Sequence, residues 1–231
     1  MQEASGDRAD SFGSNTLTDN SSVGAATGKI SGNAADFVRA STDNLSIADN
    51  PSLSFGAEDF SFGFWIYVNS TANPQYVINK WAASGSREYH ILLVSGMKLR
   101  MLVSYDGGSY TTLNHTTTLS TGTWYWVYAY HQNGVELGIS INNAAATTIA
   151  HTTGGFDGSS PFEVGMRSSG NYLDARLQQL AVWRAVKSAD DRTSIYNGGS
   201  GLAHSSWDAG GGPALHFLTI HRRSENSLIG R

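Results

Sequence analysis

Between residues 59 and 68 the chain reads Asp-Phe-Ser-Phe-Gly-Phe-Trp-Ile-Tyr-Val. In an extended strand successive side chains point to opposite faces, so alternate residues share a face. Helical spacing would not gather the apolar residues of this stretch on one side. We therefore predict a buried β-strand with Trp65 and Tyr67 on its opposite face. The face predicted to lie in the core carries Phe60, Phe62, Phe64, Ile66 and Val68.

Further strand-like runs follow at short intervals, separated by turn sequences such as Asn133-Gly134. A parallel crossover needs about a dozen residues or more, so such close spacing predicts antiparallel hairpins. Ser188 is placed as the N-cap of a short helix that would stop at Gly198-Gly199. The prediction is an all-β antiparallel sandwich, of jelly-roll type, with one short C-terminal helix. The runs span residues 76–80, 88–94, 97–104, 123–131, 135–142, 162–166 and 173–183.

The composition fits one large all-β domain. The chain has 231 residues, 40% of them hydrophobic and only 15% charged, with 26 glycines to serve its turns. A net charge of −4 without a basic cluster gives no reason to expect a nucleic acid partner. The absence of cysteine excludes disulfides, thiolate catalysis and cysteine-based zinc sites. A polar N-terminus and the lack of a long apolar run predict no signal peptide in this chain and no membrane insertion.

Several segments together resemble the laminin-G-like jelly rolls of bacterial and phage proteins, within the concanavalin A-like lectin-glucanase superfamily. They occur in the family's order and spacing between about residues 8 and 204. The resemblance implies a laminin-G-like sandwich domain over residues 1–209 and a C-terminal extension over residues 210–231. The matching segments are residues 35–49, Phe60–Val68, Asn79-Lys80-Trp81 with Arg87-Glu88-Tyr89, residues 121–127, Ile139–Asn143, and Leu177–Trp183 with the helix that follows.

Two departures from the family pattern matter. Members often carry an Asp-Glu pair in the last long strand, where this chain has Gln178 and Gln179. The family also opens with an apolar strand that is missing ahead of the first residues here. A vacant strand position leaves unpaired backbone groups. We therefore predict that residues 214–221, which look strand-like, fill it within the same chain or in a neighbouring copy, which would make a homo-oligomer.

The outward aromatic residues are the candidate ligand site. If the strands over residues 59–68 and 123–131 are neighbours, Trp65, Trp126 and Tyr128 would form a platform for stacking sugar rings, with Tyr67 on the same face. His90 and Arg100 would supply hydrogen bonds at its edge. The competing interpretation, which the abundance of aromatic residues at interfaces favours, is that loops or a neighbouring subunit cover these rings.

Two further groups of polar residues have candidate roles. The resemblance implies a Ca²⁺ site, for which Asp36, Asp43 and Asp174 are the candidate ligands, because this hard cation prefers oxygen. The alternative is that these aspartates only form turns. Lys80 and Glu88 are predicted to be an ion pair within a hairpin.

No catalytic set is recognisable. The paired carboxylates that laminarinase-type enzymes need, as Glu-x-Asp-x-x-Glu on one strand, do not occur. We therefore predict a non-enzymatic recognition module of lectin or adhesion type, which binds a glycan or a surface protein outside the cell or on a virion surface. The alternative is a structural subunit of a virion or extracellular fibre that self-associates by strand complementation. A polysaccharide-active enzyme is the third interpretation.

Overall fold

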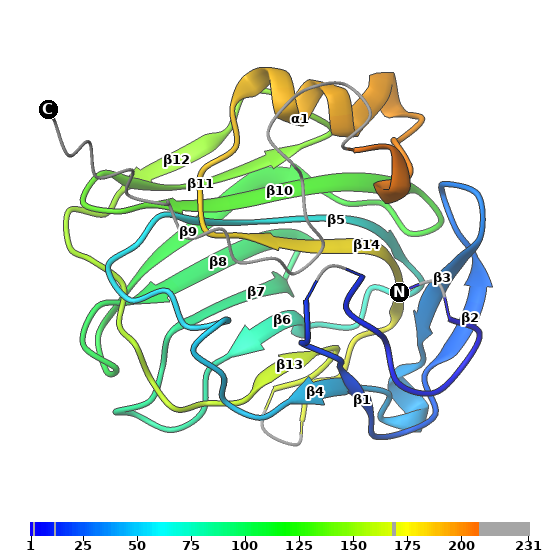
Figure 1. Cartoon of the computed structure of the whole chain (residues 1–231), viewed down its shortest axis with the longest axis horizontal. Helices are drawn as coiled ribbons and strands as arrows, with labels where there is room; N and C mark the ends of the chain where they lie inside the picture. Colours follow the sequence, from blue (N-terminus) through cyan, green and yellow to red (C-terminus); the bar gives the residue numbers. More distant parts are fainter. Residues whose placement is uncertain (2, 12, 168–169, 208–231) are drawn as a thin grey trace, which may run out of the picture.

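A computed structural model describes residues 1, 3–11, 13–167 and 170–207. Two antiparallel sheets of seven strands each pack face to face, which confirms the predicted sandwich (Figure 1). The first sheet has the order β1-β4-β13-β6-β7-β8-β9, and its strands are β1 Thr18–Asp19, β4 Leu45–Ile47, β13 Phe162–Val164, β6 Gln75–Lys80, β7 Tyr89–Val94, β8 Lys98–Ser104 and β9 Tyr110–Thr118. The second has the order β12-β11-β10-β5-β14-β3-β2, and its strands are β12 Thr147–Ala150, β11 Glu136–Ile141, β10 Trp124–Gln132, β5 Phe60–Val68, β14 Ala175–Trp183, β3 Asn33–Phe37 and β2 Gly24–Thr27.

Strand β5 has the predicted bounds and the predicted inner face. It lies between β10 and β14, in the middle of the second sheet. The alternate apolar residues of β5 all belong to the core between the sheets, where they meet inward residues of the first sheet such as Leu99 and Met101. Trp65 lies directly opposite Trp126 of β10, so the two strands that carry the predicted aromatic platform are neighbours.

Four strands had no counterpart in the sequence prediction. They are β9, which is rich in threonine, and the short strands β1, β2 and β12. Each of them is the last strand at one edge of its sheet. An edge strand has a neighbour on one side only and exposes much of its surface, so it does not need the apolar alternation that identifies a central strand.

The helix α1 spans Ala189–Tyr196, as its capping sequence predicted. The side chain of Ser188 accepts a hydrogen bond from the Asp191 amide at 3.1 Å, and Asn197 ends the helix in the left-handed conformation. Short 3-10 turns lie at Arg39–Ser41, Asn197–Gly199 and His204–Ser206. Figure 1 shows α1 outside the second sheet, on the side away from the first. It therefore covers part of that sheet's outer face.

Gln178 has a structural role at the position where the family often has an acid. Its amide donates to the carbonyls of Ile30 and Asn33 at 3.0 and 3.1 Å, and accepts from the Ile30 amide at 2.9 Å. Gln179 sits at a bulge of β14 with φ of 51°, and both polar atoms of its buried side chain are without a hydrogen-bond partner among the described residues. The predicted strand at residues 214–221 and the extension over residues 210–231 lie outside the described residues.

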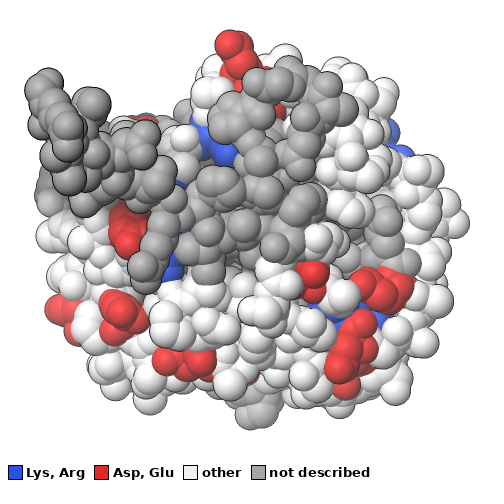
Figure 2. Space-filling model, viewed as in Figure 1, with Lys and Arg blue, Asp and Glu red and all other residues white. Residues whose placement is uncertain are grey.

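Charged groups are sparse on one face of the molecule. The face shown in Figure 2 is mostly uncharged over the described residues, with small separate groups of acidic side chains and few basic ones. In the part of the chain that the structure describes, we find no helix that combines the length and hydropathy needed to cross a membrane.

Candidate binding site

The predicted aromatic platform exists, but it is covered. Trp65, Trp126 and Tyr128 are only 2%, 1% and 1% exposed. The ring of Tyr196, at the end of α1, stacks 6.0 Å from the ring of Trp65 and lies 5.8 Å from that of Trp126. Arg192 of the same helix lies 5.2 Å from the Tyr128 ring. The expectation of an open platform is therefore wrong, and the competing interpretation that other parts of the protein cover these rings holds, because the helix that follows β14 folds back over them.

A hydrogen bond and close aromatic packing hold the helix region on the second sheet. Tyr128 accepts a hydrogen bond from the Lys187 amide at 2.7 Å, which ties the loop before α1 to β10. A side chain at Gly63 of β5 would approach the ring of Trp183 to 2.8 Å, so this strand position needs glycine. A hollow of about 300 Å³ remains beside the helix, between Tyr128, Tyr130 and the loop at residues 143–146.

Tyr67 lies on the same outer face but nearer the end of β5. Its ring is 4.9 Å from the Arg176 guanidinium and 5.4 Å from the Trp124 ring, and the side chain is half-buried. The structure thus brings Trp65, Tyr67, Trp126 and Tyr128 onto one face, as predicted.

His90 and Arg100 do not lie beside that platform. They belong to β7 and β8 of the first sheet and line a hollow on the other side of the sandwich. Their predicted place at the platform's edge was wrong, because alternation gives the face of a strand but not the sheet to which the strand belongs. We call this hollow the arginine hollow; its volume is about 270 Å³. Its lining is Tyr76, Trp81, Arg87, His90, Leu92, Arg100, Leu102, Tyr110 and Arg167.

Aromatic and aliphatic residues form the floor of the arginine hollow. Tyr76, Trp81, Leu92 and Leu102 make a small buried cluster on the outer face of the first sheet. The ring of Tyr110 lies 5.2 Å from that of Trp81, edge to face, and is 45% exposed. Tyr110 therefore offers an accessible aromatic ring at the rim, whereas Trp81 supports the site from below.

Each of the three arginines is positioned by uncharged groups. Arg87 donates to the Gly108 carbonyl at 3.0 Å and lies over Trp81. Arg100 donates through Nε to the Asn114 side chain at 2.6 Å. Arg167 donates to the Tyr76 hydroxyl at 3.2 Å and lies over that ring. Cation–π contacts and hydrogen bonds hold the guanidinium groups while they keep their charge.

His90 lies at the base of this arrangement. Its side chain is 4% exposed, and its Nδ1 is buried without a hydrogen-bond partner among the described residues. Burial, followed by the positive charges of Arg167, Arg100 and Arg87, lowers the pKa of His90 to about 3. The imidazole is therefore neutral at ordinary pH, and the charge of the hollow comes from the arginines alone.

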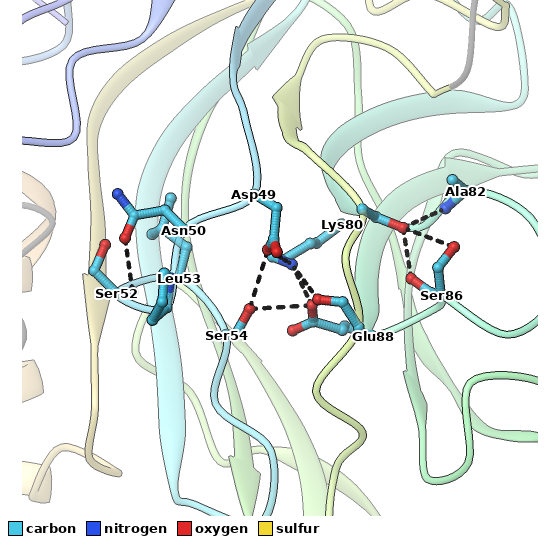
Figure 3. Close-up of polar contacts among 12 residues, drawn as sticks. Asp49, Asn50, Ser52, Leu53, Ser54, Lys80, Ala82, Ser86 and Glu88 are labelled. Atoms are coloured by element: carbon cyan, nitrogen blue, oxygen red, sulfur yellow. Dashed lines mark hydrogen bonds and ion pairs between the residues drawn. The ribbon is translucent and has the colours of Figure 1, made fainter.

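Lys80 and Glu88 form the predicted hairpin ion pair, next to strands β6 and β7 (Figure 3). The Lys80 ammonium is fully buried and also contacts Asp49 at 2.7 Å and the Gly158 carbonyl at 3.1 Å. Burial raises the pKa of Glu88 to about 7, against the opposing effect of Lys80. The pair joins the hairpin to the segment after β4 and serves structure.

The three aspartates proposed as calcium ligands do not converge. Asp36 lies 3.6 Å from Arg176, while Asp43 accepts a hydrogen bond from the Val38 amide at 2.9 Å and has a buried Oδ1 without a partner among the described residues. No cluster of three acidic, histidine or cysteine side chains suited to a metal ion occurs in the described ranges. The described residues thus show no shared site for these three carboxylates, and calcium binding stays an untested prediction.

Most residues of the arginine hollow were not among the predicted site residues. Trp81, Arg87 and Tyr110 lie at hairpin ends or on the unpredicted strand β9, and Arg167 follows β13. One signal in the sequence could have pointed to this hollow: His90 and Arg100 lie on two successive strand-like runs joined by a short turn. Pairing of His90 with Leu102 and of Leu92 with Arg100 brings both residues to one face.

Comparison with known families and structures gives three findings. A family model described as "Concanavalin A-like lectin/glucanases superfamily" matches residues 39–191. A search among curated protein sequences finds no match. Similar solved structures include binding domains of clostridial toxins, and this chain spans less than half of their length.

The binding domain of Paraclostridial Mosquitocidal Protein 1 is 15% identical, with a TM-score of 0.65 over 76% of this chain and 45% of that one. A second structure concerns botulinum neurotoxin type C, whose cell entry depends on interaction with two ganglioside molecules. It is 16% identical, with a TM-score of 0.51 over 67% of this chain and 39% of that one. The binding domain of botulinum neurotoxin DC with rat synaptotagmin II gives 17% and 0.53, covering 67% and 40%. At these identities the likeness concerns the fold.

Proposed function

Because this chain belongs to the laminin-G family of the concanavalin A-like lectin/glucanases superfamily, we propose that it is a non-catalytic recognition module that binds a glycan on an exterior surface. The observation that carries the proposal is the arginine hollow, where an exposed aromatic ring stands beside fixed hydrogen-bond donors. Binding sites commonly combine apolar surface with a few well-placed polar groups.

The residues of the hollow suit binding better than chemistry. Among the described residues its lining contains no carboxylate, and its histidine is neutral and buried. Glycosidic bond cleavage needs a paired acid and base, or nucleophile, on either side of the bond. Arginine side chains supply several directed N–H donors but do not exchange protons near neutral pH. The arrangement therefore supports recognition.

The fold relatives give the proposal its biological setting. The similar toxin structures include binding domains, and they concern gangliosides in one case and synaptotagmin II in another. A module of the same fold that acts outside a cell, on a glycan or a surface protein, is consistent with them. Fold alone does not carry function, so the proposal depends on the hollow.

A glycan array tests the proposal. Labelled wild-type protein is expected to bind a restricted set of glycans, and Tyr110→Ala to lower that signal at least fivefold. Tyr105→Ala is the matched control, since Tyr105 is similarly exposed, at 41%, and is not part of the lining. Equal loss with both variants, or binding unaffected by Tyr110→Ala, would place recognition elsewhere. A protein that ignores the array and assembles into filaments would favour a structural subunit.

A further inference from the structure

The arginine hollow carries positive charge that no acidic side chain of the described residues neutralises. Its described lining includes three arginines and no aspartate or glutamate. This contrasts with the chain as a whole, whose net charge is −4. Elsewhere Arg8, Arg176 and Arg184 each lie within ion-pair distance of an acidic side chain. Among the described residues, no such pair involves the three arginines of the hollow. The excess of positive charge is therefore local.

The arginines are also available to a ligand. All three side chains are partly exposed, and each is anchored through only part of its guanidinium group. Arg100 uses Nε to contact Asn114, and its two terminal nitrogens make no hydrogen bond to a described residue. A guanidinium held in this way presents its remaining donors in a fixed fork that matches a carboxylate or sulfate.

The positive potential reaches the base of the hollow. The three arginines all act on the buried imidazole of His90, which lies among them and stays neutral. Bringing like charges together costs free energy unless a counter-charge joins them. An anionic ligand would supply that counter-charge, so its binding energy would include the relief of this repulsion.

The dimensions limit the ligand further. A volume of about 270 Å³ lies just below the range of roughly 300–1,000 Å³ that is usual for small-molecule sites. The hollow therefore has room for one ring-sized group, while the exposed Tyr110 ring at the rim offers a stacking surface for the apolar face of a sugar.

We propose that the arginine hollow binds one acidic sugar residue of a glycan. Arg100 and Arg167 bind its carboxylate or sulfate, and Tyr110 packs against its ring. This inference rests on the proposed function, in which the hollow is the glycan site. The inference adds that the site selects a glycan by the negative charge of one of its sugars, and that the arginines recognise this charge. Binding should weaken as salt is raised, because the charges are partly exposed to solvent.

The test measures the affinity of the full chain for matched probes by biolayer interferometry: lactose, 3′-sialyllactose, a glucuronate-terminated disaccharide and 3′-sulfated lactose. At least one acidic probe is expected to bind ten times or more tightly than lactose, and to lose fivefold or more between 50 and 500 mM NaCl. Preference for the carboxylated or the sulfated probes identifies which anionic group the arginines take.

Variants locate the effect. Arg100→Gln and Arg167→Gln should each lower acidic-probe affinity at least tenfold. Arg192→Gln is the matched control: Arg192 also lies over an aromatic ring and forms no acidic ion pair among the described residues, but it lies on α1 across the sandwich. It should change affinity less than twofold. Circular dichroism and thermal melting check that every variant is folded.

The outcomes separate the two proposals. Equal binding of neutral and acidic probes, weakened by Tyr110→Ala but not by Arg100→Gln, would overturn the acidic-sugar inference and leave the glycan site intact. No binding to any probe or array glycan would overturn both. Tighter binding of a single-stranded oligonucleotide than of any acidic sugar, lost in Arg100→Gln, would overturn the ligand class.

Discussion

The two outer faces of the sandwich both carry aromatic residues at outward positions, yet they differ in what lies on top of them. On the second sheet, α1 closes over Trp65, Trp126 and Tyr128 through Ile195 and Tyr196. On the first sheet, arginine side chains and Tyr110 stand over Trp81, without a helix above them among the described residues. Outward aromatic rings can thus be a second core or the floor of a binding site.

The two faces differ in what covers their aromatic rings, and not in the kind of ring that they carry. Tryptophan is almost fully buried in both places, at 1% for Trp126 and 2% for Trp81. The covering groups differ: a helix contributes apolar contacts that stabilise the fold, whereas arginines leave charge and unused donors at the surface. The same kind of residue should therefore affect stability alone on one face, and both stability and binding on the other.

The largest expected effect follows from removing a ring below the helix. Trp126→Ala should lower the free energy of unfolding by about 3–5 kcal/mol, because it leaves a cavity in a closed aromatic cluster. Urea unfolding followed by circular dichroism measures this. Trp81→Ala is the matched change on the other face, and only it should also weaken acidic-probe binding by the folded protein. A loss below about 1 kcal/mol for Trp126→Ala would mean that α1 does not pack on this face.

The second effect concerns pH. His90 has a pKa near 3 when folded and 6.5 as its ordinary value, so the unfolded chain gains a proton first as the pH falls. Stability from this group is complete above pH 6.5 and is lost as the pH falls toward 3, by about 2 kcal/mol at pH 5. His90→Gln should remove that part of the pH dependence in unfolding experiments at pH 5 and 7.5.

His131 provides a control for the pH measurement on His90. Burial also lowers its pKa, to about 4, and it lies outside the arginine hollow. His131→Gln should therefore reduce acid sensitivity in the same direction, while leaving the binding of acidic probes unchanged. An unaltered pH profile in His90→Gln would contradict the burial of a neutral imidazole beneath the arginines.

A smaller effect is expected at the cover itself. Tyr196→Ala should lower the free energy of unfolding by about 1–2 kcal/mol, since the half-buried ring covers Trp65 and Trp126 but lies at the edge of the cluster. In folded Tyr196→Ala, the newly exposed Trp65 and Trp126 should give a fluorescence emission that is red-shifted from that of the wild type. Tyr196→Phe keeps the ring and should retain the wild-type spectrum. Identical spectra for all three proteins would show that Tyr196 does not shield these rings.

The smallest effect is predicted for Arg100→Gln, within about 0.5 kcal/mol of the wild-type stability. Its charge has no acidic partner among the described residues, and its removal lessens repulsion in the hollow. Arg184 is the comparison, because it pairs with Glu58 and donates to the Ser54 carbonyl at 2.7 Å. Arg184→Gln should therefore lower the free energy of unfolding by more than Arg100→Gln does. Thermal melting decides; a loss above about 1 kcal/mol for Arg100→Gln would make its role structural.

Much of the fold was predictable because the pattern of central strands is local. The alternation in β5 and β10 gave their inner faces correctly, and the caps of α1 gave both its ends. The ion pair of Lys80 with Glu88 also followed from its place in a hairpin. The edge strand β9 escaped detection, since an exposed strand carries mostly polar residues such as Thr116 and Thr117.

By itself, the sequence determined the sandwich, its core and the outward direction of Trp65, Trp126, His90 and Arg100. Only the tertiary structure decided that the first two lie beneath α1 and the last two lie on the opposite sheet, beside Arg87 and Arg167. The physical reason is that side-chain alternation is fixed by the geometry of a single strand. The order of strands in the sheets, and what covers each face, depends on contacts between segments far apart in the chain.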